Sequence, residues 1–234
     1  MVVLDLPREI KLTDQNLWLD GGSASAGAGL DGREQILFTE NRRWVGQLDF
    51  AHLQGKSALL GRSIGSRLRG RAHVLRVSVC NAFTARFLGN AVAFYRSIGV
   101  DEGDIAFGST RFSDGVSFGD GSGFSLPSTE EPRIVYDASV GATSLTFEGF
   151  IGRNIEIGAR FSINDYLYEI ASNDDGVVTF NPPLRESVNE GQVVQVSTPT
   201  ILVRLRDDDG WRPFMRNGRY TLPFQVDVVE AFDR

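Results

Sequence analysis

The chain has 234 residues, a formal net charge of −6 and 41% hydrophobic residues, which is enough for a packed core and excludes a wholly disordered chain. Its single cysteine excludes an internal disulfide, and no apolar stretch reaches the roughly 20 residues that a membrane-spanning helix needs. We therefore expect a soluble protein made in a reducing compartment, and the 26 glycines and 16 phenylalanines are typical of a turn-rich β fold.

The charge is distributed unevenly along the chain. Residues 33–96 hold eleven Lys or Arg against three acidic residues, so this segment carries +8 and the remainder carries −14. Such separation favours self-assembly, in which the basic face of one copy meets the acidic face of another. An ordinary solvated face and contact with nucleic acid are the alternatives, although the basic segment lacks the interleaved aromatic residues of most nucleic-acid sites.

The first fifty residues are predicted to form strands and loops. Residues 10–19 alternate apolar and polar side chains, and we expect two short strands with a turn between them. Gly21–Gly32 contains only small residues besides Leu30 and Asp31 and is expected to be a flexible loop. Two strands follow on either side of a turn at Glu40–Asn41. The aromatic residues expected in the core are Trp44 and Phe50.

Residues 51–69 change to a helical period, because their apolar residues recur at spacings of seven, four and four. We expect one helix that covers the apolar face of a sheet and is ended by Gly70, although three glycines weaken the prediction. The apolar face of this helix consists of Leu53, Leu60, Ile64 and Leu68.

The middle of the chain is less regular. A strand is predicted around Val74–Val79, and Cys80 at its end is interpreted as a small buried hydrophobe. Residues 82–97 fit either a strand pair or a short helix. Residues 99–131 alternate Gly, Ser and Asp with single phenylalanines, which indicates a long loop or a loose hairpin. Its spaced aromatic anchors are Phe107, Phe112, Phe118 and Phe124.

Residues 133–199 have the pattern of a compact β module, with about six short strands expected. Turns are predicted at Ser139–Thr143, at Asn164–Asp165 and at the Asp-Gly pair of Asn173–Gly176, and Pro182–Pro183 ends a strand. A closed barrel hides the edges of such short strands best.

The strands after Thr200 are predicted to pair with the N-terminal sheet. The fold is therefore expected to be mainly β. It has a β-sandwich-like base domain with one helix, built from residues 1–132 and 200–234. A small OB-like β-barrel, residues 133–199, is inserted into that base.

No sequence motif indicates catalysis or a bound cofactor, and we expect neither. His52 and His73 lack metal-ligand spacing, and the acidic runs at 101–104 and 207–210 lack the spacing of an EF-hand, so no metal site is expected. No nucleophile elbow is expected in a strand–turn–helix context, and no dinucleotide-binding glycine pattern is expected to follow a strand and open a helix. The sequence also lacks a Walker lysine loop.

The module at residues 137–199 resembles one that recurs in tail and head–tail proteins of tailed bacteriophages. The resemblance is carried by "GATSLTFEGF", "GARFSINDYLYEIAS" and "GVVTFNPPLRESVNEGQVVQV", and this chain departs from the pattern at Ala159, where an acidic residue is usual. The outer segments are also similar to base domains of siphophage tail components, so the whole chain resembles a distal tail protein.

That resemblance implies a structural protein of the virion, made in the host bacterial cytoplasm and located in the baseplate at the tail tip. Its implied partners are other copies of itself, in a ring expected to be a hexamer, together with the tail tube protein and the tail hub or tip proteins. Neither a membrane nor specific nucleic-acid binding is implied.

Unlike faces meet where ring subunits contact one another head to tail. From the charge separation, the candidate residues of this subunit interface are Arg42, Arg43, Arg62, Arg67, Arg69, Arg71, Asp207, Asp208 and Asp209.

Two alternatives to the structural role remain open. The first is a carbohydrate-binding β module used in attachment to the host surface, with Tyr166, Tyr168, Trp211 and Phe214 as candidate exposed aromatics; packing in the core is the other interpretation of these residues. The second is a hydrolase acting on cell-wall polymer, for which the sequence offers no catalytic motif.

Overall fold

The chain divides into two compact units. The first unit consists of Met1–Val79, Asn164–Leu167 and Thr200–Arg234, and the second consists of Cys80–Ile163 and Tyr168–Pro199. The expected place of residues 80–132 in the base domain falls largely outside the described residues and stays a prediction. The computed structural model describes residues 1–7, 9–28, 34–38, 42–79, 109–110, 124–125, 131–149, 155–213, 215–216 and 220–232.

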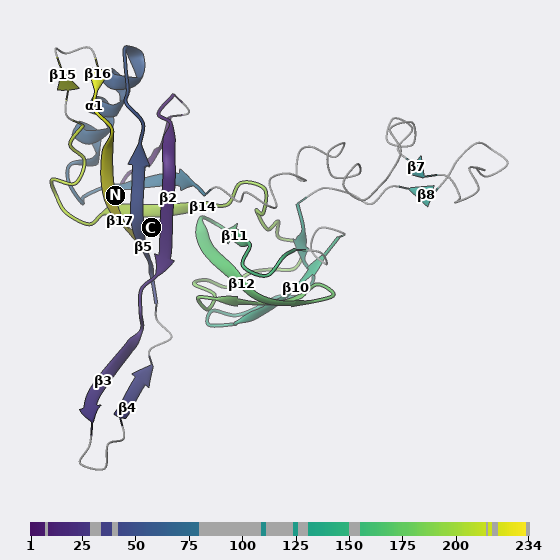
Figure 1. Ribbon diagram of the computed structural model, residues 1–234. Coiled ribbons are helices and arrows are strands. Elements are labelled where there is room, and N and C mark those ends of the chain that lie inside the picture. Colours follow the sequence, from purple (N-terminus) through teal and green to yellow (C-terminus); the bar gives the residue numbers. More distant parts are fainter. Residues whose placement is uncertain are drawn as a thin grey trace. The chain divides into compact units, whose positions relative to one another are not determined.

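The first unit is built on a six-stranded sheet with the strand order β1-β6-β14-β17-β5-β2. Figure 1 labels four of its neighbouring strands, β14, β17, β5 and β2. β1 and β6 are parallel, and all other neighbours are antiparallel. The prediction that the C-terminal strands pair with the N-terminal sheet is confirmed, because β14 and β17 occupy its two central positions. The strands are β1 (Val3–Asp5), β6 (Val74–Ser78), β14 (Thr200–Leu205), β17 (Phe224–Glu230), β5 (Trp44–Phe50) and β2 (Leu12–Leu19).

This sheet is strongly curled. The side-chain Nε2 of Gln15, on the edge strand β2, donates a hydrogen bond to the carbonyl of Ser78, on β6, at 2.8 Å. Three strands, β14, β17 and β5, lie between β6 and β2 in the sheet order, so only a curled sheet can bring Ser78 and Gln15 together. The mainly β character of the fold is confirmed, and the residues that the structure describes contain one helix. The base consists of one sheet that folds over its own core.

Alternation along the strands places one face of the sheet in that core. On β5, every second residue (Trp44, Gly46, Leu48 and Phe50) is buried, while the residues between them are half-buried. Both expected core aromatics, Trp44 and Phe50, are only 1% exposed. The main core residues on the other strands are Leu17, Leu75, Val77, Ile201, Val203, Leu205, Val226 and Val228.

The predicted helix is confirmed as α1 (Lys56–Leu68), which buries Ala58, Gly61, Ile64 and Leu68. Arg69 at its C-cap and Gly70 both adopt positive φ, so the helix ends where the sequence predicted. The helix glycines make close approach possible. A Cβ on Gly61 would lie 2.8 Å from Leu53, and one on Gly65 would lie 2.7 Å from Trp211.

Two predictions for the first fifty residues are wrong. Gly21–Gly32 was expected to be a loop, but β3 (Ser23–Ala28) pairs antiparallel with β4 (Glu34–Phe38). Pairing with a strand partner outweighs the low β propensity of the small residues in β3. The expected turn within residues 10–19 is a register shift inside the continuous strand β2, between Leu12 and Asp14.

The second unit contains a five-stranded antiparallel sheet in the order β11-β12-β13-β10-β9. The two hairpin turns predicted there are confirmed. Asn164 and Asp165 adopt φ of 49° and 63°, and Asp175 and Gly176 adopt 46° and 93°, as tight hairpin turns require. The strands are β9 (Arg133–Ile134), β10 (Ser144–Glu148), β11 (Arg160–Ile163), β12 (Tyr166–Asp174) and β13 (Val177–Asn181).

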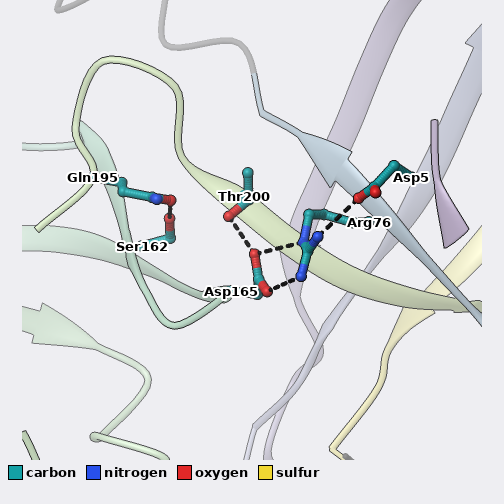
Figure 2. Close-up of polar contacts among 6 residues, drawn as sticks. All are labelled: Asp5, Arg76, Ser162, Asp165, Gln195 and Thr200. Atoms are coloured by element: carbon teal, nitrogen blue, oxygen red, sulfur yellow. Dashed lines mark hydrogen bonds and ion pairs between the residues drawn. The ribbon is translucent and has the colours of Figure 1, made fainter. Parts of the chain in front are cut away.

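A short segment links the two edges of this curled sheet in place of the expected sixth strand. Val193 forms a β-bridge with Arg133 on β9, and Gln195 forms one with Ser162 on β11. Ser162 Oγ also donates to Gln195 Oε1 at 3.2 Å (Figure 2). The prediction of a regular last strand is therefore wrong. Isolated β-bridges pair this segment with the two edge strands, β9 and β11. The aromatic core of the unit consists of Phe147, Phe161, Tyr168 and Phe180.

Two short ribbons complete the described strands. β7 (Ser109–Thr110) pairs with β8 (Phe124–Ser125), and β15 (Met215–Arg216) pairs with β16 (Tyr220–Thr221). Among the residues that the structure describes, no helix is both long enough and apolar enough to cross a membrane. The predictions for Cys80, for residues 82–97 and for most of residues 99–131 lie outside the described residues.

Candidate subunit interface

The outward face of α1 carries part of the predicted basic surface. Leu59, Arg62, Ser63, Ser66 and Arg67 are all exposed and recur at helical spacing, so they lie on one side of the helix. Leu59 is 61% exposed, which places a large aliphatic side chain among the arginines. No ion pair joins Arg62 or Arg67 to any described residue. The helix therefore presents a cationic surface with an apolar patch.

The other predicted basic residues lie in several different places. Arg42 is half-buried, and its guanidinium donates to the carbonyls of Asp20 at 2.9 Å and Leu19 at 3.4 Å, which fastens the end of β2. Arg43 is exposed beside it, and Arg69 is exposed at the C-cap of α1. The structure thus gives Arg42 a local structural role and does not bring all the predicted arginines onto one surface.

The predicted acidic half of the interface pairs within its own chain. Asp208 Oδ1 accepts hydrogen bonds from the backbone N and the Nε of Arg71, both at 3.2 Å. Asp209 forms an ion pair with Arg212. The carbonyl of Asp207 accepts from Gly210, which closes the turn at 3.0 Å. All of these side chains are exposed, so the pairs are weak, but Asp208 and Asp209 already have cationic partners in the subunit.

A second acidic surface lies on the outer face of β2, β5 and β17. Asp14 on β2 stands directly opposite Asp49 on β5, and Asp227 on β17 stands opposite Gln47 on β5. Asp14 is exposed, whereas Asp49 and Asp227 are half-buried. Cross-strand neighbours of like charge destabilise a sheet, and in the described part of the chain no ion pair relieves this one.

Trp18 lies on the same outer face and is 44% exposed. The four residues Asp14, Trp18, Asp49 and Asp227 were missed by sequence reasoning, because their common face depends on strand register. The alternation of residues 44–50 was the available signal, since it assigns Asp49 to the side of β5 away from the core.

The helix surface and the sheet surface lie on opposite sides of the core. The Nε1 of Trp211 donates to the carbonyl of Gly61 in α1 at 2.7 Å. The Trp211 ring packs edge-on against Phe50 and Phe224, with centroids 5.1 Å and 5.6 Å away, on the inner face of β5 and β17. Trp211 therefore connects the inner side of the helix to the inner side of the sheet, and both charged surfaces point outward.

A polar cluster fixes the short segment Asn164–Leu167 within the first unit (Figure 2). Asp165 Oδ1 and Oδ2 accept from the Nε and Nη2 of Arg76 at 3.0 Å and 2.9 Å. Thr200 Oγ1 donates to the same carboxylate at 2.7 Å, and Asp5 accepts from Arg76 Nη1 at 2.8 Å. The hydrogen bond with Asp165 raises the pKa of the Arg76 guanidinium, and partial burial opposes this effect.

A second contact holds the same segment through a buried tryptophan. The indole Nε1 of Trp44 donates to the carbonyl of Leu167 at 2.7 Å, and the backbone N of Trp44 donates to the buried carboxylate of Glu230 at 3.0 Å. The polar groups around Asn164–Leu167 hydrogen-bond to one another, so their role is to hold this segment in place.

The aromatic residues suggested for sugar binding do not form an exposed platform. Tyr166 and Trp211 are each 7% exposed, and Tyr168 is fully buried with its hydroxyl accepting from the backbone N of Arg185. Packing in the core is thus the correct interpretation for these three, and Phe214 lies outside the described residues. A sugar-binding platform needs open aromatic faces, so these three residues are no longer candidates for it, and the carbohydrate-binding alternative itself stays a prediction.

The other sites considered from the sequence have local roles. His73 Nδ1 accepts from the backbone N of Val2 at 3.2 Å, and His52 is exposed just before α1. Asn173–Gly176 is a hairpin turn, as predicted. Within the described ranges, no group of three or more His, Cys, Asp or Glu side chains is arranged to hold a metal ion.

A scan against models of known protein families and a search of curated proteins both found no match for this chain.

Proposed function

We propose that this protein is a ring-forming structural subunit of the tail tip of a tailed bacteriophage, joining the tail tube to the host-recognition apparatus. The resemblance of residues 137–199 to a module of phage tail proteins suggests the setting. In this role the protein is not an enzyme, and its partners are other copies of itself, the tail tube protein and the tail hub or tip proteins.

The observation that carries the self-assembling role is the ribbon formed by β3 and β4. Ile36 and Leu37 on β4 are 64% and 70% exposed, and as neighbours in a strand they point to opposite faces of the ribbon. A two-stranded ribbon is marginally stable in water by itself. Burying each aliphatic side chain against a partner would stabilise the ribbon by about 1.5–3 kcal/mol of free energy. The ribbon is therefore expected to be more stable when it contacts another chain than when it is surrounded by solvent.

The described part of the first unit also contains two edge strands. β1 and β2 are the outer strands of the six-stranded sheet, and Val2 and Val3 beside the β1 edge are 50% and 39% exposed. Unpaired strand edges with apolar side chains favour association with another chain. These edges and the β3–β4 ribbon support a subunit whose surface is completed by its neighbours.

The test is the mass and shape of the purified chain in solution. We expect light scattering to show a closed oligomer at high protein concentration and negative-stain microscopy to show rings. The variant Ile36→Ser/Leu37→Ser should shift the protein toward monomer. Its matched control is Val140→Ser/Ile157→Ser, which changes two comparably exposed aliphatic residues of the second unit. A wild-type chain that stays monomeric at every concentration would overturn the proposal.

A further inference from the structure

We propose that the outer face of α1 in one copy docks on the outer face of β2, β5 and β17 in the next copy. This inference rests on the proposed ring function and names its contact surfaces. It replaces Asp207–Asp209 as the acidic half of the interface, because Asp208 and Asp209 have cationic partners within the subunit.

Charge is the first property that matches the two surfaces. The helix presents Arg62 and Arg67 with no acidic partner among the described residues. The sheet presents Asp14 and Asp49 as a like-charged cross-strand pair with no basic partner in the same ranges. Arginines placed between these carboxylates relieve their repulsion, so the helix of one copy supplies the positive charge that the sheet face of the next copy lacks.

The second matching property is an exposed apolar residue on each surface. Leu59 is 61% exposed among the helix arginines, and Trp18 is 44% exposed on the sheet face. Packing of Leu59 on Trp18 removes both apolar surfaces from water. An exposed tryptophan face is also favourable for an arginine guanidinium, which the helix supplies at Arg62.

The spacing of the two sets agrees. Leu59 and Arg67 are eight residues apart, which is about 12 Å along a helix at roughly 1.5 Å per residue. Trp18 and Asp14 are four residues apart, which is about 14 Å along a strand at roughly 3.4 Å per residue. With the helix laid along β2, Leu59 meets Trp18 when Arg67 reaches the Asp14–Asp49 pair.

The placement of the surfaces determines the kind of assembly. They lie on opposite sides of the core, with Trp211 between the helix and the inner face of the sheet. A contact between two different surfaces of the same subunit is heterologous, and repeating it produces a ring when the rotation closes. The contact therefore fits a cyclic oligomer of identical chains.

The experiment uses two full-length charge-reversal variants. The helix variant is Arg62→Glu/Arg67→Glu, and the sheet variant is Asp14→Lys/Asp49→Lys. We expect each to be folded by circular dichroism and to assemble at least roughly tenfold more weakly than the wild type, because like charges then face each other. The control Glu156→Lys/Glu190→Lys makes the same charge change as the sheet variant at exposed positions of the second unit and should assemble normally.

Mixing the two variants gives the decisive measurement. In an alternating ring every contact regains opposite charges, so an equimolar mixture of the helix and sheet variants should form rings of even order while neither variant does so alone. Rings formed by either variant alone at the concentration at which the wild type assembles would overturn the docking proposal and leave the ring function standing. A mixture of folded variants that stays monomeric would also overturn it. A monomeric wild type would overturn the ring function and the docking proposal together.

Discussion

Both carboxylate oxygens of Asp165 accept hydrogen bonds from the guanidinium of Arg76, with Oδ1 3.0 Å from Nε and Oδ2 2.9 Å from Nη2. The two residues are 89 positions apart in the sequence. Arg76 lies on β6, and the carboxylate also accepts from Thr200 at the start of β14. A single side chain in a hairpin turn thus connects two strands of the six-stranded sheet. This bidentate, charge-assisted pairing is a strong kind of polar contact, and it joins Asn164–Leu167 to the strands of the first unit.

We expect Asp165→Asn to lower the free energy of unfolding of the first unit by about 1–3 kcal/mol, because it removes the charge that two Arg76 donors face. Asparagine tolerates the positive φ of this position, so the turn itself is kept. All three tryptophans, Trp18, Trp44 and Trp211, belong to the first unit, and their fluorescence during urea unfolding measures its stability.

Asp5→Asn is the control for that measurement. Asp5 is the other partner of Arg76, but its side chain is 75% exposed, so the loss should stay below about 1 kcal/mol. Equal losses in the two variants would contradict the special role of Asp165.

The raised pKa of Arg76 predicts how this contact responds to pH. Because the folded-state pKa lies above the ordinary pKa of an arginine, the stabilisation is fully present below that ordinary pKa and is lost only as pH rises through the folded-state pKa. We therefore expect the stability difference between the wild type and Arg76→Gln to be constant across neutral and mildly alkaline pH. A difference that shrinks with mild alkalinity would show that another titrating group controls the contact.

Gly65→Ala should destabilise the first unit. In an exposed helix this substitution stabilises by up to about 1 kcal/mol, but here the new Cβ would lie 2.7 Å from the Trp211 ring. The Trp211 ring is buried and is hydrogen-bonded to the carbonyl of Gly61, so it has little room to move away. We therefore expect the steric overlap to lower the free energy of unfolding by about 1–3 kcal/mol net.

Ser63→Ala changes an exposed residue of the same helix and should leave stability within about 0.5 kcal/mol of the wild type. Tryptophan fluorescence in urea compares the two variants directly. Stabilisation by Gly65→Ala would contradict the close approach of the helix to the Trp211 ring.

Asp208→Asn tests whether the Arg71 pair matters for folding or for assembly. The side chains of Arg71 and Asp208 are 58% and 73% exposed, so we expect a loss of stability below about 1 kcal/mol. Light scattering of this variant should also show unchanged assembly, because the acidic docking surface is assigned to the sheet. Clear dissociation of the oligomer by Asp208→Asn would restore the loop as part of the interface.

Local signals in the sequence were sufficient for the hairpin turns and the helix. Asn164–Asp165 and Asp175–Gly176 tolerate positive φ, and the spacing of Ile64 and Leu68 placed α1 correctly. The pairing of the C-terminal strands with the N-terminal sheet was also predicted, since both ends of the chain carry strands that need a common core.

Features that depend on register or on distant partners could not be predicted. β3 contains only small residues and forms because β4 pairs with it, so propensity alone indicated a loop. The shared face of Asp14 and Asp49 depends on the register shift after Leu12, and Asp165 finds Arg76 only in the folded chain. The acidic half of the proposed docking contact consists of such residues, so the sequence alone pointed instead to the acidic run Asp207–Asp209.

The central position of β14 and β17 has a consequence for the timing of synthesis. The ribosome makes these strands after the second unit, yet they lie between the β1–β6 pair and the β5–β2 pair. Until residues 200–230 have been made, the two earlier pairs have no common neighbour, and the sheet face that includes Asp227 does not exist. Contacts of such long sequence separation form late in folding. A chain that has not yet reached these residues therefore cannot present that face. Incomplete chains are thus excluded from any assembly that uses it as a contact surface.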